Sequence, residues 1–148
     1  MIYKLFFLTY GIANLCLIFY GVLVLLGPSI LLEPFLTHVY RFPDEATKAT
    51  TYLEALYRLL GYFNLIPGLF GLILLLRARI SHETWISRIV VISTSSAYLG
   101  PIVFDNTVGR IGPFEIIEHI LFASLIILGI MIWNTPWTSP VSKNHTSL

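Results

Sequence analysis

The chain has 148 residues, enough for one domain, of which 56% are hydrophobic and 11% are charged. Soluble domains usually have about a quarter of their residues charged, so this composition excludes a soluble globular protein and predicts an integral membrane protein. The formal net charge of +1 gives no reason to expect a nucleic-acid partner, and the single cysteine, Cys16, cannot form an internal disulfide.

Four apolar segments are each about long enough to cross a bilayer. The predicted spans cover about residues 5–26, 53–76, 85–104 and 113–133, within one transmembrane domain at residues 1–135. The predicted fold class is therefore all-α, an antiparallel four-helix transmembrane bundle. Residues 136–148 are polar and are predicted to form a disordered tail.

Local signals predict where each helix begins and ends. The first apolar run is too long for a signal-peptide core and is expected to stay as an uncleaved signal anchor, ending at Gly27-Pro28. An amphipathic connector follows, and Asp44 or Thr47 is expected to cap a second helix at about residues 46–76. Prolines predict kinks at Pro67 and Pro101. Gly112-Pro113 predicts a break followed by the start of the fourth helix.

Four spans place both termini on one side of the membrane, and the distribution of basic residues selects that side. The side with the termini has Lys4, Arg77, Arg79, Arg88 and Lys143, whereas the other has Arg41, Lys48 and Arg110. This bias predicts cytosolic termini in a multi-pass protein of the endoplasmic reticulum. The glycosylation sequon at Asn144 would then remain unused.

The strongest candidate site lies at the start of the fourth span. Glu115, Glu118 and His119 are spaced i, i+3 and i+4, so they share one helix face within the first turns of an apolar helix. Ionisable groups at such a depth are costly unless they line a polar cavity or pair with one another. We therefore interpret them as acid–base or substrate-binding groups. The alternative is hydrogen bonding between helices that stabilises the bundle.

Two further groups of residues are expected to face the same cavity. In the second span, Glu54, Tyr57 and Arg58 share a helix face, either as a structural Glu54–Arg58 ion pair or as a base with substrate-orienting partners. In the third span, Tyr98 and Asp105 are seven residues apart, and Asp105 is either a turn residue or a carboxyl at the cavity mouth.

The pattern of these motifs resembles the small DoxX-like four-helix membrane proteins. The likeness covers about residues 10–133 and rests on Glu54, Tyr57 and Gly61 in span two, Asp105 after span three, and Glu115 or Glu118 in span four. In size, aromatic content and polar rim, the chain is also similar to small membrane enzymes of fungal polyketide and meroterpenoid pathways, which open epoxides by hydrolysis or cyclisation. Sterol-isomerase-like proteins, which also place Glu and His inside the membrane, are a further comparison of type.

These observations favour a cofactor-independent acid–base enzyme that opens an epoxide or isomerises an apolar secondary metabolite. In this hypothesis Asp105 or Glu118 protonates the epoxide oxygen. A second carboxylate, Glu54 or Glu118 with His119, takes a proton from the nucleophile, and Arg58, Tyr57, Tyr98 and Glu115 contact the substrate. No metal site is predicted, and haem between His38 and His119 is a minor alternative. The rival hypothesis is a non-catalytic DoxX-like membrane protein that binds a lipid, a sterol or a protein partner. Association with other membrane enzymes of a pathway is also expected.

Overall fold

The computed structural model describes residues 1–27, 43–108 and 112–135, and it leaves out the side chains of residues 43–50, 104, 105, 108 and 114. The described chain forms four α-helices: α1 (Ile2–Leu26), α3 (Pro43–Ser81), α4 (Thr84–Val108) and α5 (Pro113–Trp133). All four are long and apolar enough to cross a membrane. The predicted fold class, an all-α antiparallel four-helix bundle, is confirmed.

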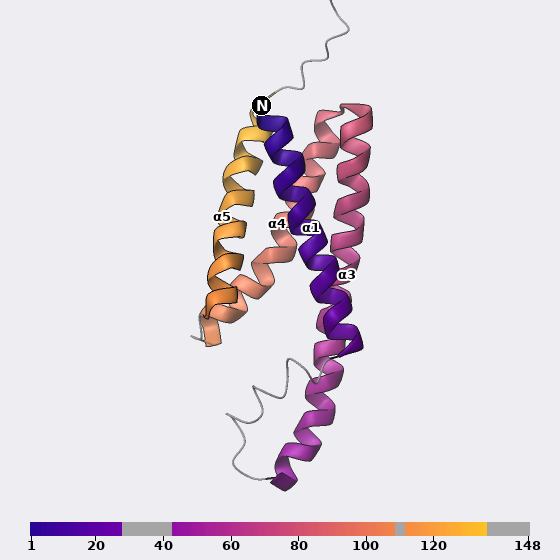
Figure 1. Cartoon of the computed structure of the whole chain (residues 1–148), viewed down its shortest axis with the longest axis vertical. Helices are drawn as coiled ribbons and strands as arrows, with labels where there is room; N and C mark the ends of the chain where they lie inside the picture. Colours follow the sequence, from indigo (N-terminus) through magenta and orange to yellow (C-terminus); the bar gives the residue numbers. More distant parts are fainter. Residues whose placement is uncertain (28–42, 109–111, 136–148) are drawn as a thin grey trace, which may run out of the picture.

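The helices form a ring in which α1 packs against α3 and α5, α3 packs against α4, and α4 packs against α5. Figure 1 shows that α4 and α5 lean away from α1 and α3 over the half of the bundle opposite the N-terminus. A short turn joins α3 to α4, and His82 adopts the left-handed backbone conformation there, with φ of 55°. This turn places Ser81 and Thr84 at the same end of the bundle as the N-terminus.

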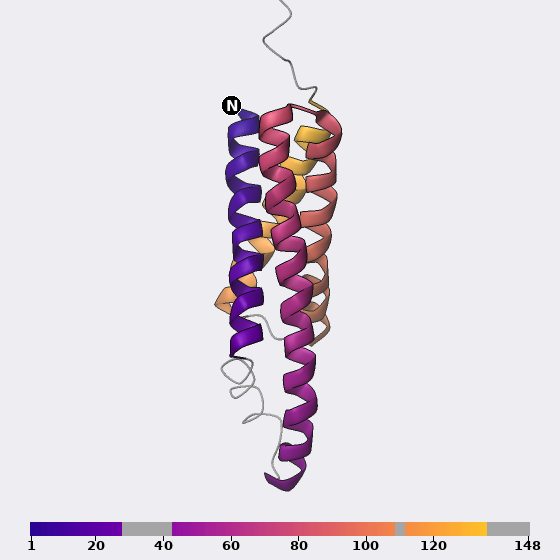
Figure 2. The ribbon, with the colours of Figure 1, turned by 90° about the vertical axis from the view of Figure 1, so that its right-hand side faces the viewer.

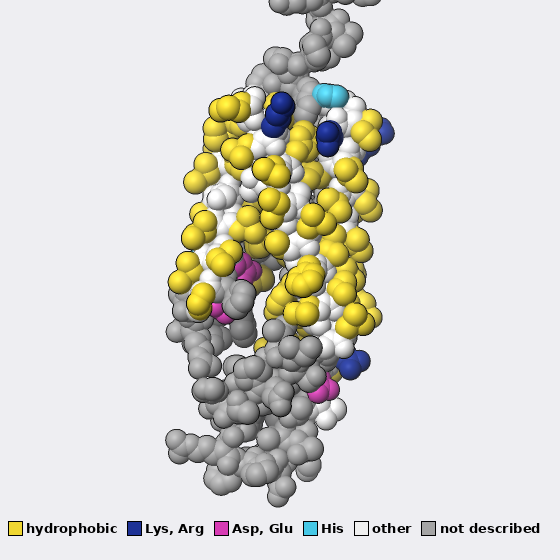
Figure 3. Space-filling model, viewed as in Figure 1, with side chains coloured by type: hydrophobic (Ala, Val, Ile, Leu, Met, Phe, Trp, Pro, Cys, Tyr) yellow, Lys and Arg dark blue, Asp and Glu magenta, His cyan; other side chains and the backbone are white. Residues whose placement is uncertain are grey.

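The outer surface is apolar along most of the bundle (Figure 3). Most of the basic side chains in this view gather at the end that carries the N-terminus, and one more lies toward the opposite end. An apolar outer surface is what a lipid environment requires, because ionisable side chains that face hydrocarbon are costly. The structure therefore supports a multi-pass protein in a lipid bilayer.

Some helices begin and end where the apolar segments do, and others extend beyond those segments. Helix α5 covers the predicted residues 113–133, and α1 starts three residues earlier than residue 5. Helix α3 starts at Pro43, and α3 and α4 continue past Pro67 and Pro101. At 39 residues, α3 is roughly 58 Å long. This exceeds the roughly 30 Å of a bilayer core, and Figure 2 shows α3 projecting past α1. The predicted connector, the caps at Asp44 and Thr47, and the tail lie outside the described residues or side chains.

Helices α1 and α3 meet backbone to backbone along a seam of small residues. The α3 side of this seam has a 3–4–3–4–3 spacing typical of a helix–helix interface: Gly61, Asn64, Gly68, Gly71, Leu75 and Ala78. A Cβ atom added to Gly21 of α1 would lie 2.8 Å from the Gly61 carbonyl oxygen. One added to Gly71 would lie 2.1 Å from Asn14 Oδ1. The glycines therefore allow a close approach that larger residues would prevent.

A buried polar cluster joins α4 and α5 to α1 near the middle of the bundle. Asn14 and Thr94 are fully buried, and Asn14 Nδ2 donates to Thr94 Oγ1 at 3.1 Å and to the Tyr10 carbonyl at 2.7 Å. The Tyr10 hydroxyl donates to the Leu125 carbonyl of α5 at 2.8 Å. These contacts satisfy polar groups that would otherwise be unpaired in an apolar interior.

Candidate functional site

The start of α5 is fixed by Glu115, a predicted substrate-binding residue. The Gly112 backbone N–H donates to Glu115 Oε2 at 2.8 Å, and Pro113 occupies the first helical position. A glutamate at the third helical position commonly binds back to the preceding N–H groups, and its charge suits the positive end of the helix dipole. The structure thus gives Glu115 a helix-capping contact at the edge of the site.

His119 is held by hydrogen bonds at both ring nitrogens. Its Nδ1 lies 2.6 Å from the Glu115 carbonyl oxygen, and its Nε2 lies 2.9 Å from Asn106 Nδ2 of α4. Asn106 Nδ2 also donates to the Ile102 carbonyl at 2.7 Å, which fixes the orientation of its amide. A carbonyl can only accept and an amide nitrogen can only donate, so His119 carries its proton on Nδ1. The ring joins the end of α4 to the start of α5.

Glu118 lies on the interior face of α5. Its position begins a 4–3–4–3 pattern that continues through residues Phe122, Leu125, Gly129 and Ile132, of which the last three are buried. Glu118 itself is half-buried. The sequence prediction that Glu118 is directed toward the bundle rather than toward lipid therefore agrees with the periodicity of buried residues on this helix.

Tyr98 of α4 is buried and lies within electrostatic range of Glu118. It is only 4% exposed, and its hydroxyl donates to the Ala13 carbonyl of α1 at 2.8 Å. The Tyr98 hydroxyl is also within electrostatic range of Glu118 and Cys16. Since a phenol that donates one hydrogen bond can still accept another, Tyr98 can hold a donor group near Glu118.

The surface is hollowed between the halves of α1 and α5 that lie away from the N-terminus. Figure 3 shows this hollow, with acidic side chains on its α5 side. The acidic side chains described on α5 are Glu115 and Glu118, and both are half-buried. Glu118 is also within electrostatic range of Tyr98.

Glu54, Tyr57 and Arg58 lie elsewhere. Gly21 of α1 lies beside Gly61 and Leu65 of α3, and this contact sets the register of the two helices. In this register α1 ends beside about residue 59 of α3, so Glu54 lies about five residues beyond the end of α1. The bond between Tyr10 and Leu125 places Glu118 level with about residues 17–19 of α1. At 1.5 Å per residue, Glu54 and Glu118 are separated by roughly 15–20 Å along the bundle.

The alternative of an ion pair between Glu54 and Arg58 has no counterpart in the structure. No salt bridge joins the two side chains in the described part of the chain, and Arg58 is exposed. Asp105, the remaining predicted catalytic residue, belongs to α4, but its side chain lies outside those described. His38 and residues 136–148 also lie outside the described residues.

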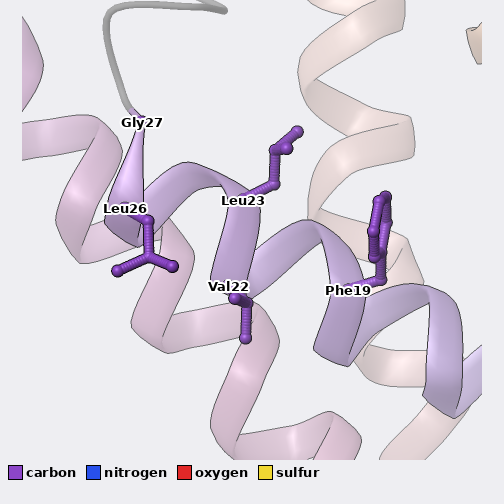
Figure 4. Close-up of a pocket in the computed structure, with 5 residues that line it drawn as sticks. All are labelled: Phe19, Val22, Leu23, Leu26 and Gly27. Atoms are coloured by element: carbon purple, nitrogen blue, oxygen red, sulfur yellow. The ribbon is translucent and has the colours of Figure 1, made fainter.

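Two shallow depressions lie on the outer surface. One, of about 250 Å³, is lined by Phe19, Val22, Leu23, Leu26 and Gly27 of α1, and Figure 4 shows Phe19 and Leu23 directed to one side of the helix. The other, of about 430 Å³, lies between α3 and α4 and is lined by Ile66, Pro67, Phe70, Ser93, Ser96 and Ala97. Neither includes an ionisable side chain, so neither competes with the Glu118 hollow as a site for acid–base chemistry.

The sequence analysis did not identify Tyr10 and Asn14, which the structure places in the polar interior. In the structure, the buried positions of α1 form one stripe from Phe6 to Val24 that includes both residues. The sequence of α1 is apolar on every face, so its pattern did not mark this stripe. In the described residues, no group of three or more His, Cys, Asp or Glu side chains is arranged to hold a metal ion.

Comparison of the chain with family models, with curated protein sequences and with solved structures finds no match.

Proposed function

We propose that the chain is an integral membrane enzyme that uses acid–base chemistry on an apolar small molecule, opening an epoxide or isomerising its substrate. The observation that carries this proposal is the half-buried Glu118 on the interior face of α5, whose acidic side chains lie at a hollow in the apolar surface. A carboxyl kept in such a setting is costly for stability, and it is a common form of catalytic group.

In the proposed reaction, a protonated carboxyl donates its proton to the epoxide oxygen as the carbon–oxygen bond breaks. Water or a hydroxyl of the substrate attacks the carbon and gives its own proton to a second carboxylate, so the net charge is unchanged. Glu118 is one of the two carboxyls. Asp105, seven residues after Tyr98 in the sequence, would be the other. If the two carboxyls approach each other, they would not both ionise readily, and one would keep its proton for donation.

The substrate class follows from the surroundings. An apolar molecule dissolved in the bilayer reaches the hollow directly, whereas a charged one would have to leave water. Tyr98 orients the oxygen, and His119 holds α4 and α5 in position. Because of their separation from Glu118, Glu54, Tyr57 and Arg58 would take no direct part in the reaction.

The proposal includes cytosolic termini in the endoplasmic reticulum and membership of a DoxX-like group, with the likeness in type to epoxide-opening enzymes of secondary metabolism. A non-catalytic membrane protein that binds a lipid or sterol is the second candidate. It is favoured by one observation: the interior side chains Tyr10, Asn14, Thr94, Tyr98 and His119 all make bonds to another helix.

Turnover by acid variants tests the proposal. Microsomes containing the chain would be incubated with a panel of lipophilic epoxides in ¹⁸O-labelled water, and the products would be analysed by mass spectrometry. Label in a diol shows attack by water, and an unlabelled isomer shows attack by an internal hydroxyl. Glu118→Gln should lower turnover by about 10²-fold or more, because a general acid or base is lost, while the protein still accumulates.

Glu54→Gln is the matched control, since it neutralises another glutamate of a membrane helix far from the hollow. It should keep turnover close to that of the wild type. Full turnover by Glu118→Gln would contradict the catalytic proposal. Binding of a radiolabelled sterol without turnover of any epoxide would favour the second candidate.

A further inference from the structure

The end of the bundle that carries the N-terminus has an excess of positive charge. Lys4, Arg77 and Arg79 are exposed there, and no acidic side chain in the described residues pairs with them. Glu83, the one acidic side chain described at this end, accepts a hydrogen bond from the Trp85 indole. Within the described part of the chain, these three cations therefore have no acidic partner.

Arg88 is the fourth cation at this end, and it is already engaged. It donates to the Trp133 carbonyl at 3.2 Å, and its guanidinium lies 5.0 Å from the centre of the Trp133 ring. It satisfies a carbonyl at the end of α5. The candidates for binding an external anion are thus Lys4, Arg77 and Arg79.

Two of these cations lie on the same edge of the bundle. A Cβ atom on Gly11 would meet Leu75 Cδ2 at 3.7 Å, so these positions face each other across the α1–α3 seam. Lys4 precedes Gly11 by seven residues, so these two lie on the same face of α1. Arg79 follows Leu75 by four residues, so these two lie on the same face of α3. Their offset along the axis is only roughly 4–5 Å. Arg77 is separated from this edge, because buried Ala78 lies between it and Arg79.

The surface that continues from Lys4 and Arg79 into the membrane is apolar. Leu8 and Leu15 follow Lys4 by four and eleven residues, and Leu76 precedes Arg79 by three, so they continue the same faces. All three leucines are at least half exposed. The two cations match the phosphate of a phospholipid, and the apolar surface below them matches its acyl chains. An anionic headgroup would also complement the positive charge of this end.

We propose that Lys4 and Arg79 bind the phosphate of an anionic phospholipid, whose acyl chains lie along the outer edge of the α1–α3 seam. The site is separate from the hollow at Glu118 and does not depend on any catalytic activity. It would fix the level of α1 and α3 in the bilayer at the membrane surface nearest the N-terminus.

The full chain would be purified from nanodiscs containing phosphatidylcholine with a minor fraction of phosphatidylglycerol, and the retained lipids would be counted by native mass spectrometry. Wild type should retain phosphatidylglycerol in preference to phosphatidylcholine. The variant with Lys4→Gln and Arg79→Gln should lose this preference by roughly tenfold or more, since each cation near a membrane surface contributes appreciably to binding of anionic lipid.

The matched control combines Arg58→Gln with Arg77→Gln, which removes the same number of charges from other positions. It should keep the preference. An equal loss in the control would show a general effect of net charge and overturn the site, as would a wild type without lipid preference. Displacement of the retained lipid by soluble glycerol phosphate would show a site for free phosphate and would also overturn the assignment.

Discussion

His119 illustrates what a single residue contributes and what its sequence position conceals. Adjacency to Glu118 suggested a catalytic pair, and that role stays a prediction. The structure shows that both ring nitrogens have partners, one within α5 and one on α4. Asn106 lies thirteen residues earlier, across a helix break, so no local spacing rule connects it with His119. The interior position of Glu118, by contrast, agrees with the spacing of buried residues within one helix.

The bridge between Asn106 and His119 predicts coupled losses of stability. Asn106→Leu and His119→Phe should each lower the free energy of unfolding by about 1 kcal/mol, the usual scale for a bond between membrane helices. The double variant should lose less than the two losses added together, because both remove one interaction. Titration with a denaturing detergent measures each loss. Thr107→Val removes a hydrogen bond within α4 alone and should show no coupling with His119→Phe; additive losses for the first pair would contradict the bridge.

At the level of helices, apolar runs were sufficient to predict how many spans the chain has, because crossing a bilayer demands a fixed length of apolar residues. They were not sufficient for contacts between helices. The small-residue stripe of α3 is visible in the sequence, but its partner is not, since Gly61, Gly68 and Gly71 suit either neighbouring helix equally well. The expected convergence of Glu54 with Glu118 depended on that register and on how far α3 extends beyond α1. The structure places these acids far apart along the bundle.

Two glycine substitutions with opposite expected effects test the seam. Gly71→Ala should destabilise the bundle by about 2 kcal/mol, because the added methyl collides with Asn14 Oδ1. Adding Asn14→Ala should recover part of that loss. Gly100→Ala, where a Cβ atom meets no other atom within 4 Å, should be neutral or slightly stabilising, because alanine favours a helix. Thermal unfolding in detergent measures all three, and an equal response at Gly71 and Gly100 would contradict close packing at the seam.

Across the whole molecule, the charges are sorted by end. Among the described residues, Lys4, Arg77, Arg79 and Arg88 are at the end with the N-terminus, whereas Glu54, Glu115 and Glu118 lie toward the other. The exceptions are Glu83 at the first end and Arg58 toward the second. Sequence predicted this distribution, because the order of spans alone assigns each loop to a side.

Topology is therefore expected to have both termini in the cytosol, since basic residues are retained on that side. A reporter fused after Leu148 should be accessible only from the cytosol, and Asn144 should stay unglycosylated in a eukaryotic host. As a positive control, a sequon placed in the connector at residues 28–42 should be glycosylated. Glycosylation of Asn144 in the intact chain would reverse the orientation, and the Glu118 hollow would then open near the cytosolic side.

The seam between α1 and α3 also has a consequence for biogenesis. The ribosome makes these two membrane-spanning helices one after the other. Both sides of this close interface are therefore in the membrane before α4 is complete. The glycines let the two backbones associate through surface fit alone, without the polar bonds that Thr94 and Leu125 later provide. Helices α4 and α5 are then added to an existing pair of helices. Asn14 is already packed against Gly71 of α3 at that stage, before Thr94 of α4 becomes available to it.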